Sequence, residues 1–155
     1  MSAMTQPKIM RMDDARQTVM RLERGMTSHL VGPADGARNL DVHINHLNAD
    51  SGLGPYHFHR YAENVYVVLS GVAQAVVDGR RYLLVPDDVA YLPPGVPHAA
   101  GSAGFGPAVV MEIYAPAGKD FNIIETPSDI EDVERPEIAH LLPGAASGLG
   151  GGRPA

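Results

Sequence analysis

Two histidines separated by one residue, His57 and His59, are the residues of this chain best placed to do chemistry. A carboxylate, Glu63, follows them, and a short apolar run that is typical of a strand begins at Val65. On an extended backbone the two imidazoles would point to the same face, roughly 6.6 Å apart along the chain, and could converge on one ion. A third imidazole, His98, arrives later in a Pro-Pro-Gly-Val-Pro-His turn. Because imidazole and carboxylate are ligands shared by iron, manganese, nickel, zinc and copper, the pattern predicts a site for one divalent transition metal ion.

The segments around these residues read as short strands joined by tight turns. Asp78-Gly79 lies between two apolar runs and indicates a two-residue hairpin, because both central positions of a type I′ turn need positive φ. The 17 glycines and 13 prolines disfavour a helical bundle. We therefore expect an all-β sandwich or barrel, with its clearest strands at residues 40–47, 65–69, 72–77, 81–85, 89–92 and 108–114.

Composition narrows the class of protein. The 155 residues suit one domain with a real core. The net charge is −6 and no basic run exceeds Arg80-Arg81, so nothing predicts a nucleic-acid surface. The absence of cysteine excludes disulfides and thiolate ligands. No stretch approaches the roughly 18 to 20 apolar residues of a membrane span, and the N-terminus lacks the apolar core of a secretory signal. We expect a cytoplasmic protein with no membrane partner.

Residues 52–71 and 87–102 resemble the two characteristic motifs of the cupins, small jelly-roll β-barrels that often hold one metal ion inside. This resemblance implies that His57, His59 and His98 are metal ligands, that Glu63 is the fourth, and that the protein is a homodimer. It also implies a cupin-like jelly-roll barrel over residues 31–125 with short flanking extensions. Residues 1–30 would pack on the barrel or on a partner, and residues 126–155 would end in a disordered Gly/Pro-rich tail.

The sequence departs from the family motifs at the fourth ligand. Counting forward from His59 places this ligand at Glu63, whereas counting back from Gly71 places it at Asn64. A carboxylate binds a divalent ion better than an amide does, so Glu63 is the preferred choice and Asn64 the alternative. In the second motif, Asp87 replaces the usual glycine and Ser102 stands where asparagine is common. Those positions shape turns, so we expect a small effect on the metal.

Three residues are candidates for catalysis: Glu63, Tyr66 and Glu112. Glu112 lies inside an apolar strand, where it either faces solvent or points inward with a functional role. Tyr66 either packs in the core or donates a proton near the metal. His43 and His46 differ by three positions, so on a strand at most one of them can point inward. The remaining histidines, expected at the surface, are His29 and His140.

The predicted function is that of a metal-dependent cupin enzyme acting on a small organic substrate. A dioxygenase-type oxidoreductase is the first hypothesis, because a histidine-rich site leaves positions open for substrate or dioxygen. Isomerase, lyase or decarboxylase chemistry can use the same ligands and is the alternative. From a different class, a non-catalytic metabolite-binding cupin, or a metal-free barrel, would also fit the sequence.

Overall fold

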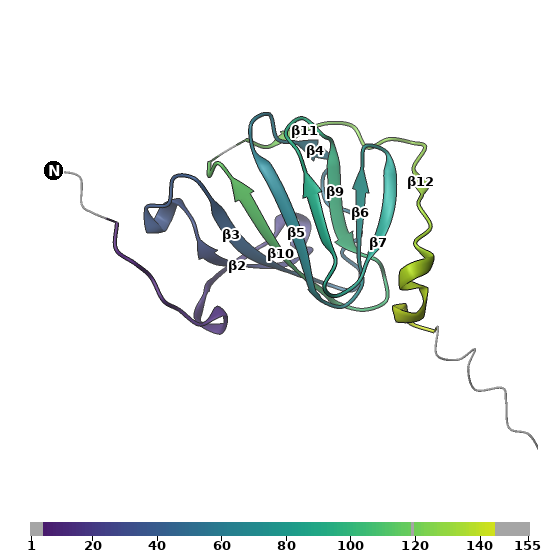
Figure 1. Cartoon of the computed structure of the whole chain (residues 1–155), viewed down its shortest axis with the longest axis horizontal. Helices are drawn as coiled ribbons and strands as arrows, with labels where there is room; N and C mark the ends of the chain where they lie inside the picture. The colour runs from purple at the N-terminus through teal and green to yellow at the C-terminus, as the bar shows by residue number, and fades with distance from the viewer. Residues whose placement is uncertain (1–4, 119, 145–155) are drawn as a thin grey trace, which may run out of the picture.

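The computed structural model of the chain describes residues 5–118 and 120–144, and its strands form two six-stranded sheets. In order across the first sheet lie β1 (Arg16–Val19), β2 (Gly25–Val31), β3 (Asp41–Leu47), β10 (Ala108–Ala115), β5 (Glu63–Ser70) and β8 (Val89–Leu92). Across the second lie β11 (Asn122–Ile123), β4 (His57–Phe58), β9 (His98–Ser102), β6 (Ala73–Val77), β7 (Arg80–Leu84) and β12 (Glu131–Asp132). The two sheets face each other as a jelly-roll barrel (Figure 1). The predicted all-β jelly roll is confirmed.

Tight turns set the strand ends where the sequence placed them. Asp78 and Gly79 have φ of 50° and 77° and join β6 to β7 as the predicted two-residue hairpin. The helical content of the described residues is limited to short 3₁₀ segments, η1 (Met12–Asp14), η2 (Arg21–Glu23), η3 (Pro33–Asp35) and η4 (Pro136–Leu141). No helix in this part of the chain is long and apolar enough to cross a bilayer.

The middle of the first sheet aligns polar residues in rows. Strand β10 is antiparallel to both β3 and β5, and Glu112 stands opposite His43 on one side and Tyr66 on the other. Two residues further along β10, Tyr114 stands opposite Asp41 and Asn64. Directly opposed side chains share one face of a sheet. The inner face at this end of the barrel is therefore polar.

The other end of the barrel is closed by apolar packing. Its main cluster draws on both sheets and is made by Leu47, Tyr66, Val68, Ala73, Ala75, Leu84, Leu92, Ala108 and Val110. Tyr66 belongs both to this cluster and to the row that contains Glu112, so the apolar cluster and the polar rows meet in the middle of β5. The barrel thus has a packed part that borders directly on a polar inner face.

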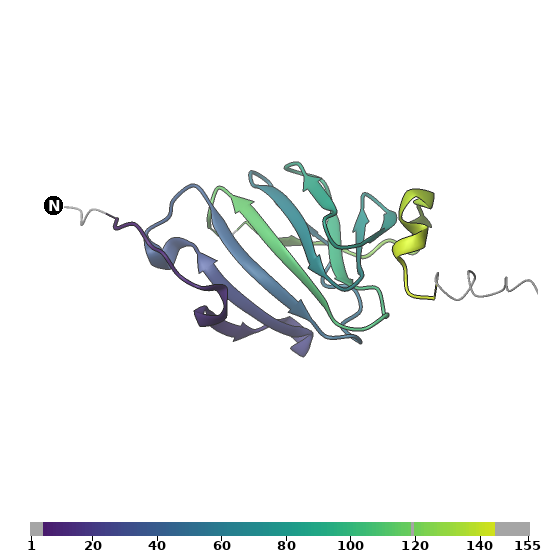
Figure 2. The ribbon, with the colours of Figure 1, turned by 60° about the horizontal axis from the view of Figure 1, so that its bottom comes forward.

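The flanking segments lie at opposite ends of the molecule (Figures 1 and 2). At one end, β1 and β2 extend the first sheet beyond β3. At the other, β12 pairs in parallel with β7, and Ile138 of η4 packs on Val72 and Val85. Such a strap covers a sheet edge that would otherwise be open to pairing with another chain. Most of the tail predicted to be disordered, from residue 145 on, lies outside the described residues.

Candidate metal centre

The structure brings His57, His59 and His98 together, with one ring nitrogen of each lying within 4.8 Å of the others. His57 is on β4 and stands directly opposite His98, the first residue of β9. His59 follows β4 by one residue, so it returns to the same side of the chain. All three side chains are buried, at 8%, 5% and 1% exposure respectively. The convergence that the spacing predicted is therefore present.

Backbone carbonyls fix the orientation of all three rings. The Nδ1–H of His57 donates to the carbonyl of Pro55 at 2.7 Å, and that of His98 to the carbonyl of Val96 at 2.9 Å. The Nδ1–H of His59 donates to the carbonyl of Asp120 at 2.6 Å. With Nδ1 protonated, Nε2 carries the lone pair in each neutral ring, which is the usual arrangement of a metal-binding histidine.

The buried Nε2 atoms of these histidines are suited to bind a metal ion. Those of His59 and His98 are fully buried and have no hydrogen-bond partner. Burial lowers the pKa of His57 to about 4 and also lowers the pKa of His98, so both rings are neutral at physiological pH. Buried polar atoms without partners are rare and call for an explanation, and a bound metal ion supplies one.

The structure does not bring Glu63 to the three histidines. Glu63 is exposed on the outer face of β5, where its carboxylate accepts a hydrogen bond from the Tyr91 hydroxyl at 2.7 Å. Its neighbour Asn64 points inward, is only 2% exposed, and has a buried Oδ1 with no partner. The two face opposite ways because side chains alternate along a strand. Asn64, the alternative fourth ligand, therefore occupies the position inside the barrel.

A residue that the sequence did not single out, Asp120, secures the loop that carries His59. Its carboxylate accepts the backbone N–H groups of Arg60, Tyr61 and Ala62 at 2.7 to 3.1 Å. Its own carbonyl is the acceptor for His59. Asp120 is 58 to 61 residues away from these partners in sequence, so local patterns carried no signal for this contact.

A cavity of about 930 Å³ opens beside the histidines. His57 and His59 lie on its wall, which also carries Glu112 and Tyr66. Of the other candidates, His43 points into it, whereas His46 bonds to Ser28 on the opposite face. This agrees with the prediction that at most one of these two histidines points inward. The cavity is large enough for an organic molecule of drug size.

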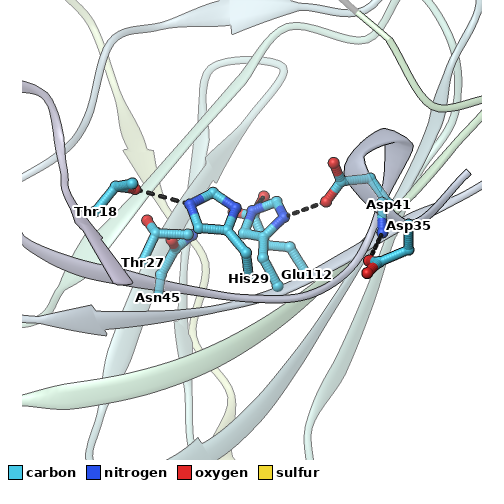
Figure 3. Close-up of polar contacts among 9 residues, drawn as sticks. Thr18, Thr27, His29, Asp35, Asp41, Asn45 and Glu112 are labelled. Carbon is cyan, nitrogen blue, oxygen red and sulfur yellow. Dashed lines mark hydrogen bonds and ion pairs between the residues drawn. The ribbon is translucent and has the colours of Figure 1, made fainter. Parts of the chain in front are cut away.

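A hydrogen-bonded chain on the cavity wall runs from Glu112 through His43 to Asp41. Figure 3 shows Asp41 and Glu112 together with a neighbouring contact, the hydrogen bond between His29 and Thr18. The His43 ring lies 2.9 Å from Asp41 through Nδ1 and 3.1 Å from Glu112 through Nε2. Burial lowers the pKa of His43, but the two carboxylates outweigh it and raise that pKa to about 10. Burial likewise opposes ionisation of Glu112, yet His43 holds its pKa below the ordinary value. Glu112 is therefore an ionised carboxylate inside the cavity.

Tyr66 lies between the hydrogen-bonded group of Glu112, His43 and Asp41 and the three histidines of the candidate metal site. It stands opposite Glu112 in the sheet, and its ring centroid is 6.0 Å from that of His98. Burial raises the pKa of its hydroxyl well above the ordinary value, so the phenol stays protonated. Of the three residues predicted for catalysis, the structure thus places Tyr66 and Glu112 on the cavity wall and Glu63 outside it.

The sequence pattern of the cupin domain matches residues 46–114, which include all three histidines. Solved cupin-type barrels share the fold, among them an RmlC-like cupin from Shewanella frigidimarina with a TM-score of 0.62. Residues 46–114 are a cupin domain.

Two further structures resemble this cupin. The polyketide cyclase RemF from Streptomyces resistomycificus has 19% sequence identity and a TM-score of 0.67, over 92% of this chain and 98% of RemF. KdgF from Halomonas sp. has 14% identity and a TM-score of 0.64, over 74% and 98% of the two chains. The Shewanella protein has 21% identity, over 76% of this cupin and 98% of its own length. No curated protein has a sequence that matches this chain. At these identities the likeness establishes the fold.

Proposed function

We propose that this cupin is a metal-dependent enzyme that moves a proton at a carbon next to a carbonyl group of a small organic substrate. The reaction would belong to the lyase, isomerase or cyclase classes. The observation that carries the proposal is an ionised carboxylate, Glu112, on the wall of the cavity that also holds the convergent histidines. A paired imidazole and carboxylate beside a candidate metal site is the equipment of general acid–base catalysis.

The ion would be held by the Nε2 atoms of His57, His59 and His98 together with Oδ1 of Asn64. The fit rests on their chemistry, since these are neutral nitrogen and oxygen donors and three of the four atoms are buried without a partner. When bound there, a divalent ion supplies Lewis-acid polarisation of a substrate oxygen.

The remaining steps belong to side chains of the chain itself. The Glu112 carboxylate takes the proton from the activated carbon, and the electron pair of the C–H bond passes to the neighbouring carbonyl. His43 stays protonated throughout and keeps Glu112 ionised between turnovers. The Tyr66 phenol, opposite Glu112, donates a hydrogen bond to the substrate oxygen. Glu112 then returns its proton, either to another carbon, as in an isomerase, or to a leaving group, as in a lyase.

The likeness to RemF supports this class of chemistry at the level of the fold. RemF is a polyketide cyclase, and its structure is matched over nearly the whole of both chains. A cavity of about 930 Å³ would hold a substrate of several rings or an extended chain.

The test is α-proton exchange measured by NMR in D₂O, with the metal-loaded protein and a panel of ketones and β-keto acids. Wild type should exchange at least one class of substrate, and Glu112→Gln should slow that exchange by about 100-fold while keeping its metal. Glu131→Gln, an exposed site on β12, is the matched control and should behave as wild type. Dioxygen consumption by the iron-loaded protein without any α-exchange would overturn the proposal in favour of a dioxygenase.

We further propose that the chain forms a homodimer. The support is an apolar patch on the outer face of β5 and β8, made by Leu69, Val89 and Tyr91, which are 41%, 64% and 58% exposed. These two strands are neighbours, so the patch is continuous. Exposed apolar surface of this kind is typical of protein–protein contacts.

A further inference from the structure

We infer that the cavity selects anionic ligands, of the class of carboxylates, phenolates and ionised 1,3-dicarbonyl compounds, over neutral molecules of the same shape. The inference rests on the metal site of the proposed function and adds the charge of the substrate to it. Three independent features of the cavity carry it: the ligand set, the arginines, and the way in which the carboxylates are already paired.

The first feature is a ligand set without charge. The three imidazoles donate their Nδ1–H groups to carbonyls, so each would bind an ion through Nε2 as an uncharged ligand, and the fourth inward position is the amide of Asn64. The carboxylate of Glu63 lies on the outer face, against Tyr91. A divalent ion on these four donors would keep its full double charge in a buried place. A charge in a medium of low dielectric attracts a counter-charge strongly. Glu112 supplies part of it from the cavity wall, and an anionic substrate bound directly at the ion would supply more.

The second feature is a set of cavity-lining arginines, Arg21, Arg24 and Arg60. Arg24 is 9% exposed and its guanidinium donates to three backbone carbonyls, those of Ser51, Gly52 and Ala100. Across residues 5–118 and 120–144, none of the three arginines forms an ion pair with a carboxylate. With protonated His43, the lining carries four cations against the three carboxylates of Asp41, Glu112 and Asp120, so the cavity is formally positive although the chain as a whole has a net charge of −6.

The third feature is that the carboxylates of the cavity wall are already paired. Asp41 and Glu112 both bond to His43, whose ring lies between them. The Asp120 carboxylate is taken up by three backbone N–H groups and by the amide of Asn122. None of these three carboxylates forms an ion pair with an arginine of the described residues, although Glu112 lies close enough to Arg24 to stabilise its positive charge. The positive charges of Arg21 and Arg60 are thus left for a ligand.

Arg21 lies close enough to the histidines to attract an anionic ligand bound beside them. Its guanidinium carbon lies 5.5 Å from the centre of the Phe121 ring, and Phe121 stacks on His57 with ring centroids 3.9 Å apart. The cation is therefore separated from the histidines by a single ring. Two consecutive residues after Arg21, Leu22 and Glu23, have positive φ of 57° and 53°. Non-glycine residues rarely adopt that conformation, and here it turns the chain sharply directly after Arg21.

The experiment compares two ligands that differ in charge and little in shape, acetate and acetamide. The protein is loaded with Co²⁺, the cobalt content is measured per chain, and each ligand is titrated at pH 7.5 and constant ionic strength while the visible cobalt bands are followed. Acetate should bind wild type at least about tenfold more tightly than acetamide.

Charge variants locate the effect. Asn64→Asp adds a carboxylate of nearly the same shape and should keep the cobalt while weakening acetate binding by about tenfold. Arg60→Gln removes an exposed cation from the cavity mouth, leaves the fold untouched, and should weaken acetate binding several-fold without changing that of acetamide. The matched control Arg80→Gln makes the same change in charge on β7, away from the cavity, and should bind both ligands as wild type does.

The outcomes separate the two proposals. One cobalt per chain with equal affinities for acetate and acetamide would overturn the anion inference and leave the metal site standing. The same holds if Arg60→Gln and Arg80→Gln weaken acetate binding equally, since the effect would then come from net charge and not from the cavity. Failure of wild type to retain cobalt would overturn the proposed metal site, and the anion inference with it.

Discussion

Asn64 occupies the inward position on β5, whereas the sequence favoured its neighbour Glu63 as the fourth ligand. Its amide oxygen is buried and without a partner, whereas Glu63 is exposed and engaged by Tyr91. A single residue of register on β5 decides between them, because neighbouring side chains lie on opposite faces of the sheet. In the proposed metal site, the ligands would therefore all be uncharged groups.

Substitution of Asn64 and of Glu63 should therefore have different effects on the metal. Asn64→Ala removes the inward donor and should lower the metal affinity by about tenfold or more. Glu63→Gln changes only the outer face and should leave the affinity as in wild type. Competition with a coloured chelator measures both. A larger loss in Glu63→Gln than in Asn64→Ala would return the fourth ligand to Glu63.

His43 gives the protein a characteristic dependence of stability on pH. Its pKa is raised to about 10 in the folded protein, from an ordinary value of 6.5, so the folded state holds one more proton than the unfolded state between these values. This stabilisation is complete below about pH 6.5 and is lost as the pH rises through 10. In that window the free energy of unfolding should fall by about 1.4 kcal/mol per pH unit.

Urea unfolding of the metal-free protein between pH 6.5 and 9.5 measures this slope. His43→Gln should flatten it, while His29→Gln, a more exposed histidine that bonds to Thr18, should keep it. An unchanged slope in His43→Gln would mean that another group titrates in this range.

At the scale of the elements, β10 and its neighbours explain why an acid on an apolar strand points into the cavity. Glu112 alternates with the outward-facing Met111 and Ile113, so it points into the barrel, and the register of three strands sets His43 and Tyr66 beside it. The segment after β10 then returns to the site, where Asp120 holds the loop of His59. The site is thus built by pairing between elements that lie far apart in sequence.

Removal of the Asp120 carboxylate should loosen the metal site without unfolding the barrel. Asp120→Ala leaves the N–H groups of Arg60, Tyr61 and Ala62 without their acceptor, so the backbone that sets the direction of His59 is free to move. We expect metal affinity to fall by about 10- to 100-fold. Chelator competition gives the affinity, and circular dichroism checks the fold.

Asp132→Ala, which removes a surface partner of Arg81, is the control for that substitution. It should change neither quantity. Equal metal affinities in Asp120→Ala and wild type would show that the position of His59 does not depend on this anchor.

At the scale of the whole molecule, the barrel separates stability from chemistry. Most members of the apolar cluster, such as Val68, Ala75 and Leu84, do not line the cavity, whereas Leu47, Tyr66 and Val110 belong both to the cluster and to the cavity wall. Because the three histidines are not members of that cluster, substitutions of ligands should be tolerated by the fold. The apolar patch on the outer face of β5 and β8 is exposed and is therefore a surface available for a second copy of the chain.

The proposed homodimer predicts a mass of twice the 16.5 kDa of one chain in light scattering after size exclusion. Val89→Glu places a charge in the middle of the patch and should shift the protein to the monomer. Leu22→Glu changes an apolar residue that is 82% exposed elsewhere and should remain dimeric. A wild-type protein that elutes as a monomer at every concentration would contradict the proposal.

The sequence by itself determined the all-β barrel, the Asp78-Gly79 hairpin and the convergence of His57 and His59. Each of these follows from local rules, namely alternation, turn chemistry and the spacing of residues on an extended chain. That His98 joins the two histidines was implied by the resemblance to the cupin motifs, because its pairing with His57 is a contact between distant segments. The choice between Glu63 and Asn64, the chain from Asp41 through His43 to Glu112, and the anchor at Asp120 were decided only by the tertiary structure. These depend on strand register and on contacts between distant segments, and a linear pattern does not encode which face of a sheet is turned inward.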